Sequence, residues 1–471
     1  MNNNAKILSN SKMHFEISER RMLLRLFDII FVLLSLYFVE IQFGVKYLEF
    51  SVSNFYWTVV LGVYILFFGS IFEMYNLQVA SNEFQVLKST VLTVSTTVLV
   101  YLLTPIFSPT LPTTRIQILT FYGIVLMTLI LWRLFYVKFL ASNRFVQNAV
   151  LICDKEQLEE LILGLENIDP HYKIIAYVSV DTIDNKDSVH DDYVQQIEKN
   201  TLVSFVKKHG VSEVVIASQK TEGITSELYQ QLLQLLESGK SIREYTQVYE
   251  SKTHRIPVHY MARDFYRFFP FSRSNNNKLY LSIVRVFEIL LSLVGIFLGV
   301  ALLPLILLGN SIGNRGVLIY TQERIGKDGV VFKILKLRTM VKNAESNGAV
   351  FTVVNDSRVT AFGRFLRKTR IDEFPQFYNI LKGDMAVIGP RPERPCFVYK
   401  IAELMPFYET RHVIKPGLSG WAQVNYSYGE NIEDSLIKLQ YDLYYIKHRS
   451  VYLDLNIALR TITTVLFYRG Q

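Results

Sequence analysis

Four long apolar stretches dominate the first third of the chain, after a polar start. They lie near residues 23–43, 55–72, 86–107 and 116–140. Each is close to the ~20 residues that a helix needs to span a bilayer. Basic residues precede the first stretch and end the fourth, so the positive-inside rule places both flanks in the cytoplasm. We therefore predict a four-helix transmembrane region at residues 1–144.

Charges within these stretches are few. Arg25, Asp28 and Glu40 lie towards the ends of the first stretch, and Arg133 and Lys138 lie at the end of the fourth. Charged pairs buried among membrane helices usually mark an ion or substrate pathway. No convincing pair is evident in the sequence, so the pattern does not favour a transporter.

The segment from 145 to 277 has the alternating pattern of a soluble α/β domain. Apolar runs that predict buried strands lie at residues 149–153, 174–180 and 211–217, and helical segments lie near 155–166, 193–208 and 225–238. This alternation predicts a parallel sheet with helices on its faces, as in a Rossmann-like domain. The turn Cys153-Asp154-Lys155-Glu156 after the first strand lacks the glycines that let a backbone approach a pyrophosphate. We predict a degenerate Rossmann-like domain without ordinary NAD binding.

A further uncharged run extends from Ile289 to Leu308 and is long enough to span a bilayer. Basic residues flank it on both sides, and a full crossing would move the basic region 315–370 out of the cytoplasm. Pro304 removes one backbone hydrogen bond and can break a helix. We therefore predict a re-entrant helix at the start of a third domain, residues 278–471; a simple span is the alternative.

Composition indicates a membrane protein with large soluble parts. Half of the residues are hydrophobic, 20% are charged, and the mean hydropathy is +0.21. Two cysteines, Cys153 and Cys396, argue against a disulfide framework or a cysteine zinc site. The formal net charge is +8, and residues 315–370 contain 12 Lys or Arg against 4 Asp or Glu. No nucleic-acid motif accompanies this region, so its expected partner is a phosphorylated substrate or an anionic lipid, with no nucleic acid.

The basic region leads into two adjacent carboxylates, Asp372 and Glu373. Around them, helical spacing predicts a face turned towards a core, made of Ile371, Phe374, Phe377, Tyr378 and Leu381, and Gly383 is placed to end that helix. Asp372 is expected to cap the helix, with Pro375 in its first turn. Phosphate and ionised carboxylates are both favoured at such a helix end, so an anionic nucleophile for a phosphate fits here. From the dipeptide alone, an ordinary helix cap is the simpler interpretation.

Several cations are candidates for binding a phosphate. Arg391 lies between two prolines, which restrict its backbone, and its planar fork suits phosphate. Lys336 and Arg338 alternate with leucines, so a strand would point both towards one face. Arg367 precedes the carboxylates closely, with a plain surface charge as the alternative. The loop Gly417–Trp421 either contacts nucleotide or membrane, or is a structural turn.

Five motifs carry a resemblance to a known family. They are Tyr320–Gly326, Phe332–Met340, Arg367–Pro392, Lys415–Asn425 and Tyr441–Tyr445. In this order they resemble the catalytic core of the bacterial polyprenyl-phosphate glycosyl-1-phosphate transferases. The resemblance covers residues 278–471 and, more weakly, the whole chain. The variant Asn425-Tyr426-Ser427-Tyr428-Gly429 is similar to the subgroup associated with exosortase-type exopolysaccharide loci.

The resemblance implies a monotopic α/β catalytic domain on the cytoplasmic face of the bacterial inner membrane. It implies transfer of a sugar-1-phosphate from a UDP-sugar to polyprenyl phosphate, with release of UMP, as the first membrane step of exopolysaccharide synthesis. Asp372 would be the nucleophile and Glu373 the second acid, and both would hold Mg²⁺. Substrate contacts are implied for Gln322, Arg324, Lys336, Arg338, Arg367, Arg391, Trp421 and Gln423.

The whole chain is therefore predicted to be a multi-pass α/β membrane enzyme. Its predicted partners are UDP-sugar, polyprenyl phosphate and membrane lipid; the identity of the sugar and a homo-oligomeric state are left open. Two other classes compete. A nucleotide-sugar oxidoreductase would be built on the middle domain, and the missing glycines count against it. A non-enzymatic polysaccharide-assembly protein would not need Asp372, Glu373 and Arg391.

Overall fold

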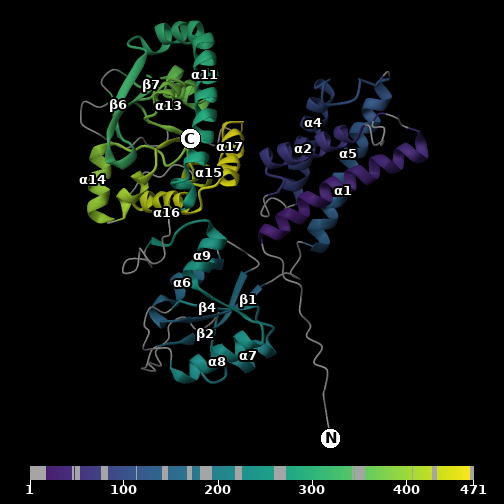
Figure 1. Ribbon diagram of the computed structural model, residues 1–471, viewed down its shortest axis with the longest axis vertical. Helices are drawn as coiled ribbons and strands as arrows, with labels where there is room; N and C mark the ends of the chain where they lie inside the picture. The colour runs from purple at the N-terminus through teal and green to yellow at the C-terminus, as the bar shows by residue number, and fades with distance from the viewer. Residues whose placement is uncertain are drawn as a thin grey trace. The chain divides into compact units, whose positions relative to one another are not determined.

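The chain divides into two units, residues 1–245 and 246–471, in the computed structural model (Figure 1). The described residues are 17–44, 47, 54–75, 83–112, 114–140, 147–166, 172–180, 194–217, 225–258, 272–341, 344, 356–405, 407–426 and 432–466. Each unit is described by itself.

Each of the four predicted apolar stretches forms one helix. They are α1 (Ile17–Phe43), α2 (Phe55–Ile71), α4 (Glu83–Leu103) and α5 (Arg115–Phe135), which continues as a π-helical turn, Tyr136–Leu140. Their shared core contains Val32, Leu61, Ile65, Val94, Tyr101 and Val125. By length and composition α1, α4 and α5 can each cross a membrane, and α2 is a shorter apolar helix of 17 residues. The chain is thus a membrane protein.

A fully buried ion pair joins α1 to α5. Asp28 Oδ2 lies 2.5 Å from Arg133 Nη2, and neither side chain is exposed. The prediction that these helices lack a buried charge pair is therefore wrong. The sequence does not reveal the pair, because only the packing of α1 on α5 brings together residues so far apart in the chain. Removing one partner of a buried pair typically costs about 3–5 kcal/mol, so this contact strongly favours one arrangement of the two helices.

A five-stranded sheet with the order β3-β2-β1-β4-β5 follows the bundle in the sequence. Its elements are β1 (Gln147–Cys153), a 3₁₀ turn (Lys155–Gln157), α6 (Leu158–Glu166), β2 (Tyr172–Ser179), β3 (Gln195–Gln196), α7 (Leu202–Lys208), β4 (Glu213–Ile216), α8 (Ser226–Glu237) and β5 (Ser241–Glu244). All neighbouring strands pair in parallel, which confirms the predicted parallel sheet. Val150 and Ile152 of β1 pack with Val206 of α7 and Leu232 of α8, which lie together on one face (Figure 1).

The second unit contains two small sheets among helices. Its elements are α9 (Tyr245–Thr253), a 3₁₀ turn (Arg273–Asn275), α11 (Lys278–Gly309), a π-helical turn η8 (Asn310–Asn314), β6 (Ile319–Ile325), a 3₁₀ turn (Lys327–Gly329), β7 (Val331–Leu337), α12 (Ala361–Lys368), η10 (Ile371–Glu373), α13 (Gln376–Lys382), β8 (Ala386–Ile388), α14 (Pro395–Leu404), η11 (Tyr408–Val413), β9 (Gly417–Ser419), α15 (Trp421–Asn425), α16 (Ile432–His448) and α17 (Val451–Leu466). β6 and β7 form an antiparallel hairpin, and β8 pairs with β9 in parallel.

The segment 246–258 packs into this second unit. Ile256 and Val258 are buried in the same core as Leu439 and Leu443 of α16. The backbone N–H of Ile256 also donates to the carbonyl of Gln440, at 3.1 Å. We predicted the domain boundary at residues 277/278, which lies after this segment. Ile256 and Val258 are isolated apolar residues, so no periodic pattern in the sequence indicates that they are buried.

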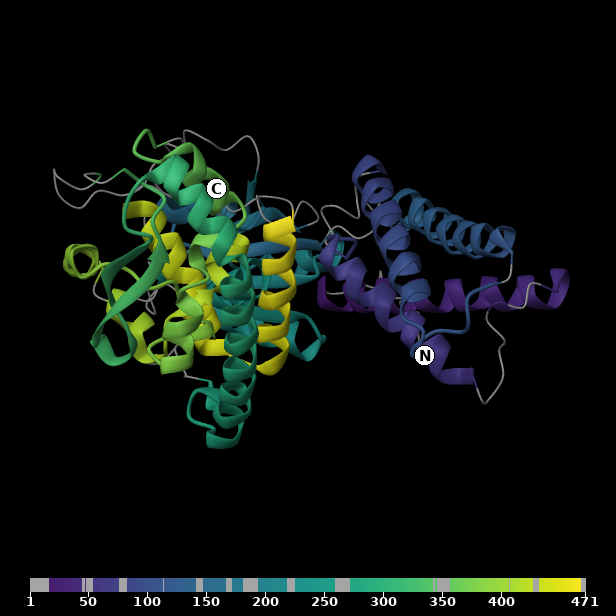
Figure 2. The same cartoon turned by 90° about the horizontal axis from the view of Figure 1, so that it is seen from above.

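α11 extends along the second unit and has both ends attached to it. Near its start, Tyr280 donates to Asp454 of α17, which lies beside α11 in Figures 1 and 2. Arg285 donates to the carbonyls of Ile380 and Leu381 at the end of α13, at 2.7 Å each. Beyond its other end, Asn314 donates to the carbonyl of Arg338 at 2.7 Å. The helix is therefore docked on the unit over its whole length.

The break expected at Pro304 is not seen, and α11 is continuous to Gly309. Proline removes a single donor, and the flanking Leu302 and Ile306 pack against Leu366, which holds the helix in place. Glycines allow close approach elsewhere along this face. A Cβ at Gly295 would collide with the ring of Phe377, for example. The opposite face of α11 is apolar and exposed.

Candidate active site

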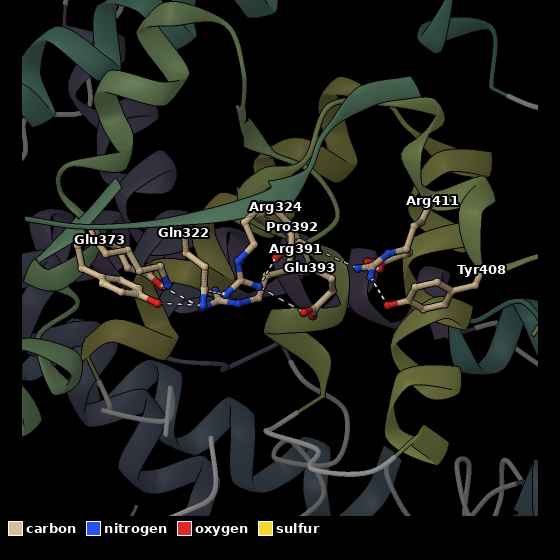
Figure 3. A network of polar contacts seen from close by, with 11 residues as sticks. Gln322, Arg324, Glu373, Arg391, Pro392, Glu393, Tyr408 and Arg411 are labelled. Carbon is tan, nitrogen blue, oxygen red and sulfur yellow. Dashed lines mark hydrogen bonds and ion pairs between the residues drawn. The ribbon is translucent and has the colours of Figure 1, made fainter. Parts of the chain in front are cut away.

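Glu373 lies at the meeting point of three cations from separate elements. Its Oε1 is 3.1 Å from Arg391 Nη2, 3.4 Å from Arg370 Nη1 and 3.6 Å from Lys336 Nζ. Lys336 comes from β7, Arg370 from the turn after α12, and Arg391 from the loop after β8. Figure 3 shows Glu373 at one end of a row of polar contacts that passes through Arg391. The tertiary fold thus gathers the carboxylates and cations that the sequence spreads over 56 positions, from Lys336 to Arg391.

The two carboxylates lie in a tight turn before α13. Arg370 has a left-handed backbone with φ 58°, and a 3₁₀ turn, Ile371–Glu373, follows it. Pro375 occupies the cap position of α13. The prediction that Asp372 caps this helix is therefore wrong, because the 3₁₀ turn separates the dipeptide from the α-helix. Gly383 ends α13 with φ 98°, which confirms its predicted role.

The buried face of α13 also differs from the prediction. The sequence pattern placed Tyr378 in a core, but its side chain is 56% exposed. Gln376, Asn379 and Ile380 are buried instead. Asn379 Oδ1 accepts from the backbone N–H of Leu335 at 3.0 Å, so a polar side chain joins α13 to β7. Such a contact cannot be read from hydrophobic periodicity.

Asp372 and Glu373 have opposite surroundings although they are adjacent. Within the described part of the chain, the carboxylate of Asp372 makes no hydrogen bond or ion pair, and the residue is 8% exposed. Burial and the charge of Glu373 raise the pKa of Asp372 to about 6. Burial alone would raise the pKa of Glu373, but Arg391, Lys336 and Arg370 outweigh it and lower that pKa to about 2. At neutral pH Glu373 is therefore an anion, and Asp372 is the more basic of the two carboxylates.

The predicted cations Lys336 and Arg338 diverge. Lys336 faces Glu373, and burial together with the charge of Arg391 lowers its pKa to about 8. Arg338 instead donates to the carbonyl of Asn314 at 2.9 Å, beside the end of α11. Arg367 of α12 donates to Thr339 Oγ1 at 2.9 Å. Its charge partly offsets the rise in the pKa of Asp372.

Gln322 and Arg324 of β6 lie in the same row of polar contacts as Glu373 and Arg391 (Figure 3). Arg324 donates to Gln322 Oε1 at 2.7 Å and to the carbonyl of Pro392 at 3.0 Å (Figure 3). Arg324 thereby supports the loop that carries Arg391.

The side chains of Trp421 and Gln423 make packing and hydrogen-bond contacts within the second unit. Trp421 is 2% exposed, and its indole N–H donates to the carbonyl of His254 at 3.1 Å. The guanidinium of Arg460 lies 5.1 Å from its ring centre. Gln423 donates to the carbonyl of Leu418 at 3.3 Å. The structure does not bring these two side chains to Glu373.

Two functional candidates escaped the sequence analysis. Arg370 contacts Glu373 directly, and its place between Arg367 and Asp372 was a signal that could have identified it. Arg411 of η11 contacts the carbonyl of Arg391 and was not identified. Nothing local marks Arg411, because its role depends on its buried partner Asp442, 31 residues away.

The donor set fits a magnesium ion that takes other ligands from a substrate. Mg²⁺ is commonly held by one or two carboxylates plus phosphate oxygens and water. Asp372 offers a carboxylate without a partner in the described residues, and the three cations of Glu373 all contact its Oε1. Among the described residues no group of three or more His, Cys, Asp or Glu gathers, so a site made of protein ligands alone is not indicated there.

Known proteins are similar to this chain in two regions. Residues 279–468 match the family described as bacterial sugar transferase, and residues 70–233 match the family described as CoA-binding domain. The second match extends from the membrane helices into the parallel sheet.

Several proteins named as transferases are similar to the chain. It is 48% identical over 153 residues to the UDP-N-acetylgalactosamine-undecaprenyl-phosphate N-acetylgalactosaminephosphotransferase of Aeromonas hydrophila, covering 32% of this chain and 36% of that protein. It is 45% identical over 141 residues to a putative undecaprenyl-phosphate N-acetylgalactosaminyl 1-phosphate transferase of Bacillus subtilis (strain 168), covering 30% of this chain and 79% of that protein. It is 38% identical over 159 residues to the UDP-glucose:undecaprenyl-phosphate glucose-1-phosphate transferase of Escherichia coli (strain K12), covering 33% and 34%. The chain thus spans about a third of the length of the first and third relatives.

Proposed function

Because the chain belongs to the bacterial sugar transferase family, we propose that it transfers a sugar-1-phosphate from a UDP-sugar to polyprenyl phosphate and releases UMP. Relatives named as undecaprenyl-phosphate sugar-1-phosphate transferases support this reaction. Neither an oxidoreductase nor a non-enzymatic assembly protein is favoured by these similarities.

The difference between the two carboxylates carries the proposal. A covalent nucleophile must be ionised and must not be tied up in ion pairs with other side chains of the protein. Asp372 meets these requirements, because it has no partner within the described residues and its pKa of about 6 leaves it largely ionised at neutral pH. Glu373 is held by Lys336, Arg370 and Arg391, so its role is to order these cations.

The proposed reaction has two displacements at one phosphorus. A carboxylate oxygen of Asp372 attacks the β-phosphorus of the UDP-sugar, a new P–O bond forms, and the bond to the bridging oxygen breaks as UMP leaves. A phosphate oxygen of the polyprenyl phosphate then attacks the same phosphorus, and the bond to Asp372 breaks. Lys336, Arg370 and Arg391 lie where they can neutralise charge on the phosphoryl oxygens.

We also propose that Mg²⁺ takes part, held by Asp372 and Glu373 together with phosphate oxygens. The ion would supply charge neutralisation at the diphosphate. The chain's own cations would orient the phosphates, and Asp372 would remain the group that attacks.

A test of the reaction is release of UMP by the full-length protein in membranes. With undecaprenyl phosphate present, we expect one or a few members of a panel of UDP-sugars to give UMP. If no member of the panel yields UMP while the Escherichia coli relative does so in the same assay, the proposed reaction is wrong. The panel also identifies the sugar, which the sequence leaves open.

The proposed location is the bacterial inner membrane, with the catalytic unit on the cytoplasmic side. α11 is 32 residues long, or ~48 Å at ~1.5 Å per residue, and both of its ends are attached to the same unit. A complete crossing would require that unit to face both sides of the bilayer. This supports a helix that inserts its exposed apolar face from the cytoplasm and does not cross.

Accessibility of single cysteines tests this topology. In a background with Cys153 and Cys396 replaced by serine, cysteines placed at Lys207 and Lys327 are both expected to resist a membrane-impermeant thiol reagent in intact cells and to react after lysis. Lys327 is exposed and lies beyond α11, so it reports on that helix. Labelling at Lys327 in intact cells would mean that α11 crosses the membrane.

Membership of the exosortase-associated subgroup stays a prediction. It rests on the variant motif at residues 425–429, and residues 427–431 lie outside the described part of the structure. A homo-oligomeric state likewise stays open.

A further inference from the structure

The reach of Arg391 to Glu373 depends on the backbone that carries it. Residues 390–393 contain two prolines, which restrict their φ angles. Each carbonyl of this segment accepts a hydrogen bond from another element. The four donors, in chain order of the acceptors, are Gly417 N (2.9 Å), Arg411 Nη2 (3.0 Å), Arg324 Nη1 (3.0 Å) and Ile325 N (3.0 Å). The loop is thus held at every peptide unit.

Arg411 donates to the carbonyl of Arg391 itself. Its guanidinium is in turn held by buried side chains. Its side chain is 4% exposed, and Nη2 also lies 2.7 Å from Asp442 Oδ2, whose side chain is 1% exposed. Nη1 donates to the hydroxyl of Tyr408 at 2.6 Å (Figure 3). One buried guanidinium therefore links α16 and η11 to the loop.

This geometry needs an arginine. The planar fork presents several donors at fixed angles, so it can serve Asp442, Tyr408 and the Arg391 carbonyl at once. A lysine ammonium is a single point and cannot reach all three oxygens. A buried ion pair often adds little to stability compared with apolar residues of the same size. A gain in stability is therefore a weak explanation for the Arg411–Asp442 pair.

We infer that Arg411, held in place by Asp442, is a positioning residue for the proposed reaction, because it fixes the carbonyl of Arg391 and so directs the Arg391 guanidinium to Glu373 and the substrate phosphates. The inference rests on the proposed function. Arg411 makes none of its described contacts with Asp372 or Glu373, so it acts through Arg391.

A kinetic double-mutant cycle tests this coupling. Arg411→Met combined with Asp442→Leu removes the pair without leaving a lone buried charge. We expect kcat to fall roughly 10- to 100-fold, since small misplacement of a catalytic group costs up to about 100-fold, with KM changed less than about 3-fold. In an Arg391→Ala background, the same pair of substitutions should change kcat by less than about 2-fold, because the group that it positions is gone.

Two single variants serve as controls. Tyr408→Phe removes one contact of Arg411 but leaves its contacts with Asp442 and the Arg391 carbonyl, so it should change kcat by less than about 3-fold. Arg411→Lys keeps the charge but not the fork and should resemble the double variant in kcat. Unchanged kcat in the folded double variant, or an equal loss in both the wild-type and Arg391→Ala backgrounds, would overturn the inference.

Hydrogen exchange separates this inference from the proposed reaction. The amides of Gly417 and Ile325, which donate to the carbonyls of Pro390 and Glu393, should exchange faster in the Arg411→Met/Asp442→Leu protein than in wild type, while those of β1 and β2 should not. If exchange is faster in the variant but the wild-type protein releases no UMP, the proposed reaction is rejected and the loop support is established. Unchanged exchange would reject the loop support even if UMP is released.

Discussion

Replacement of Asp372 by asparagine is expected to abolish sugar-phosphate transfer and to leave the fold intact. Asparagine has nearly the same volume, and the carboxylate makes no hydrogen bond or ion pair within the described residues that the substitution could break. Its amide cannot form the acyl-phosphate bond of the proposed intermediate. The rate should fall by at least about 1,000-fold, as when other covalent nucleophiles are removed.

Isotope exchange without lipid acceptor is the decisive measurement. Wild-type protein should exchange labelled UMP into the UDP-sugar, because the first displacement is reversible, and Asp372→Asn should not. Direct attack of polyprenyl phosphate on the UDP-sugar instead gives no lipid-independent exchange in either protein. Exchange that persists in Asp372→Asn would move the nucleophile, with Glu373 the next candidate.

Glu373→Gln is the matched comparison at the neighbouring position. It also retains shape, but it removes the anion that Lys336, Arg370 and Arg391 share. We expect this variant to lose activity together with thermal stability, since three cations would face one another without their common counter-charge. A drop in unfolding temperature in Glu373→Gln but not in Asp372→Asn would support the different roles of the two carboxylates.

Removal of divalent cations is expected to stop turnover. The diphosphate and the two carboxylates bring several negative charges together, and Lys336, Arg370 and Arg391 must balance Glu373 as well as the phosphates. Loss of an ion that stabilises the transition state should lower the rate by at least about 100-fold. The measurement is UMP release in EDTA, followed by titration with Mg²⁺ or Mn²⁺.

The control for this prediction is the stability of the protein itself. Because Lys336, Arg370 and Arg391 all contact Glu373 and so hold this turn, the unfolding temperature should change little in EDTA. Undiminished turnover in a metal-stripped preparation would contradict the prediction. Loss of turnover together with unfolding would assign the metal a structural role instead.

Sequence reasoning succeeded where a property repeats along the chain. Apolar stretches about as long as a bilayer requires identified the membrane helices, and alternating short runs identified the parallel sheet. It also singled out the dipeptide Asp372–Glu373 and Arg391, because each belongs to a motif of a few adjacent residues. Gly383 was predictable because the left-handed backbone that ends a helix favours glycine.

Sequence reasoning failed where a position depends on distant partners. The buried pair Asp28–Arg133 exists because two helices pack, and each charge alone looked like the end of a span. Asn379 is buried through its polar contact with β7 and Tyr378 is exposed, so the buried face of α13 differs in part from the expected one. Trp421 and Gln423 belong to a recognisable motif, yet the structure places them among packing contacts.

The sequence by itself determined the membrane helices, the parallel sheet, the family and the pair of carboxylates, because these follow from local patterns and motifs. Only the tertiary structure decided how the two carboxylates differ. Three cations from separate elements converge on Glu373 and leave Asp372 without a partner among the described residues, so one pKa falls to about 2 and the other rises to about 6. The physical reason is that electrostatic energy depends on distance and burial in space, and adjacent positions in the chain can differ completely in both.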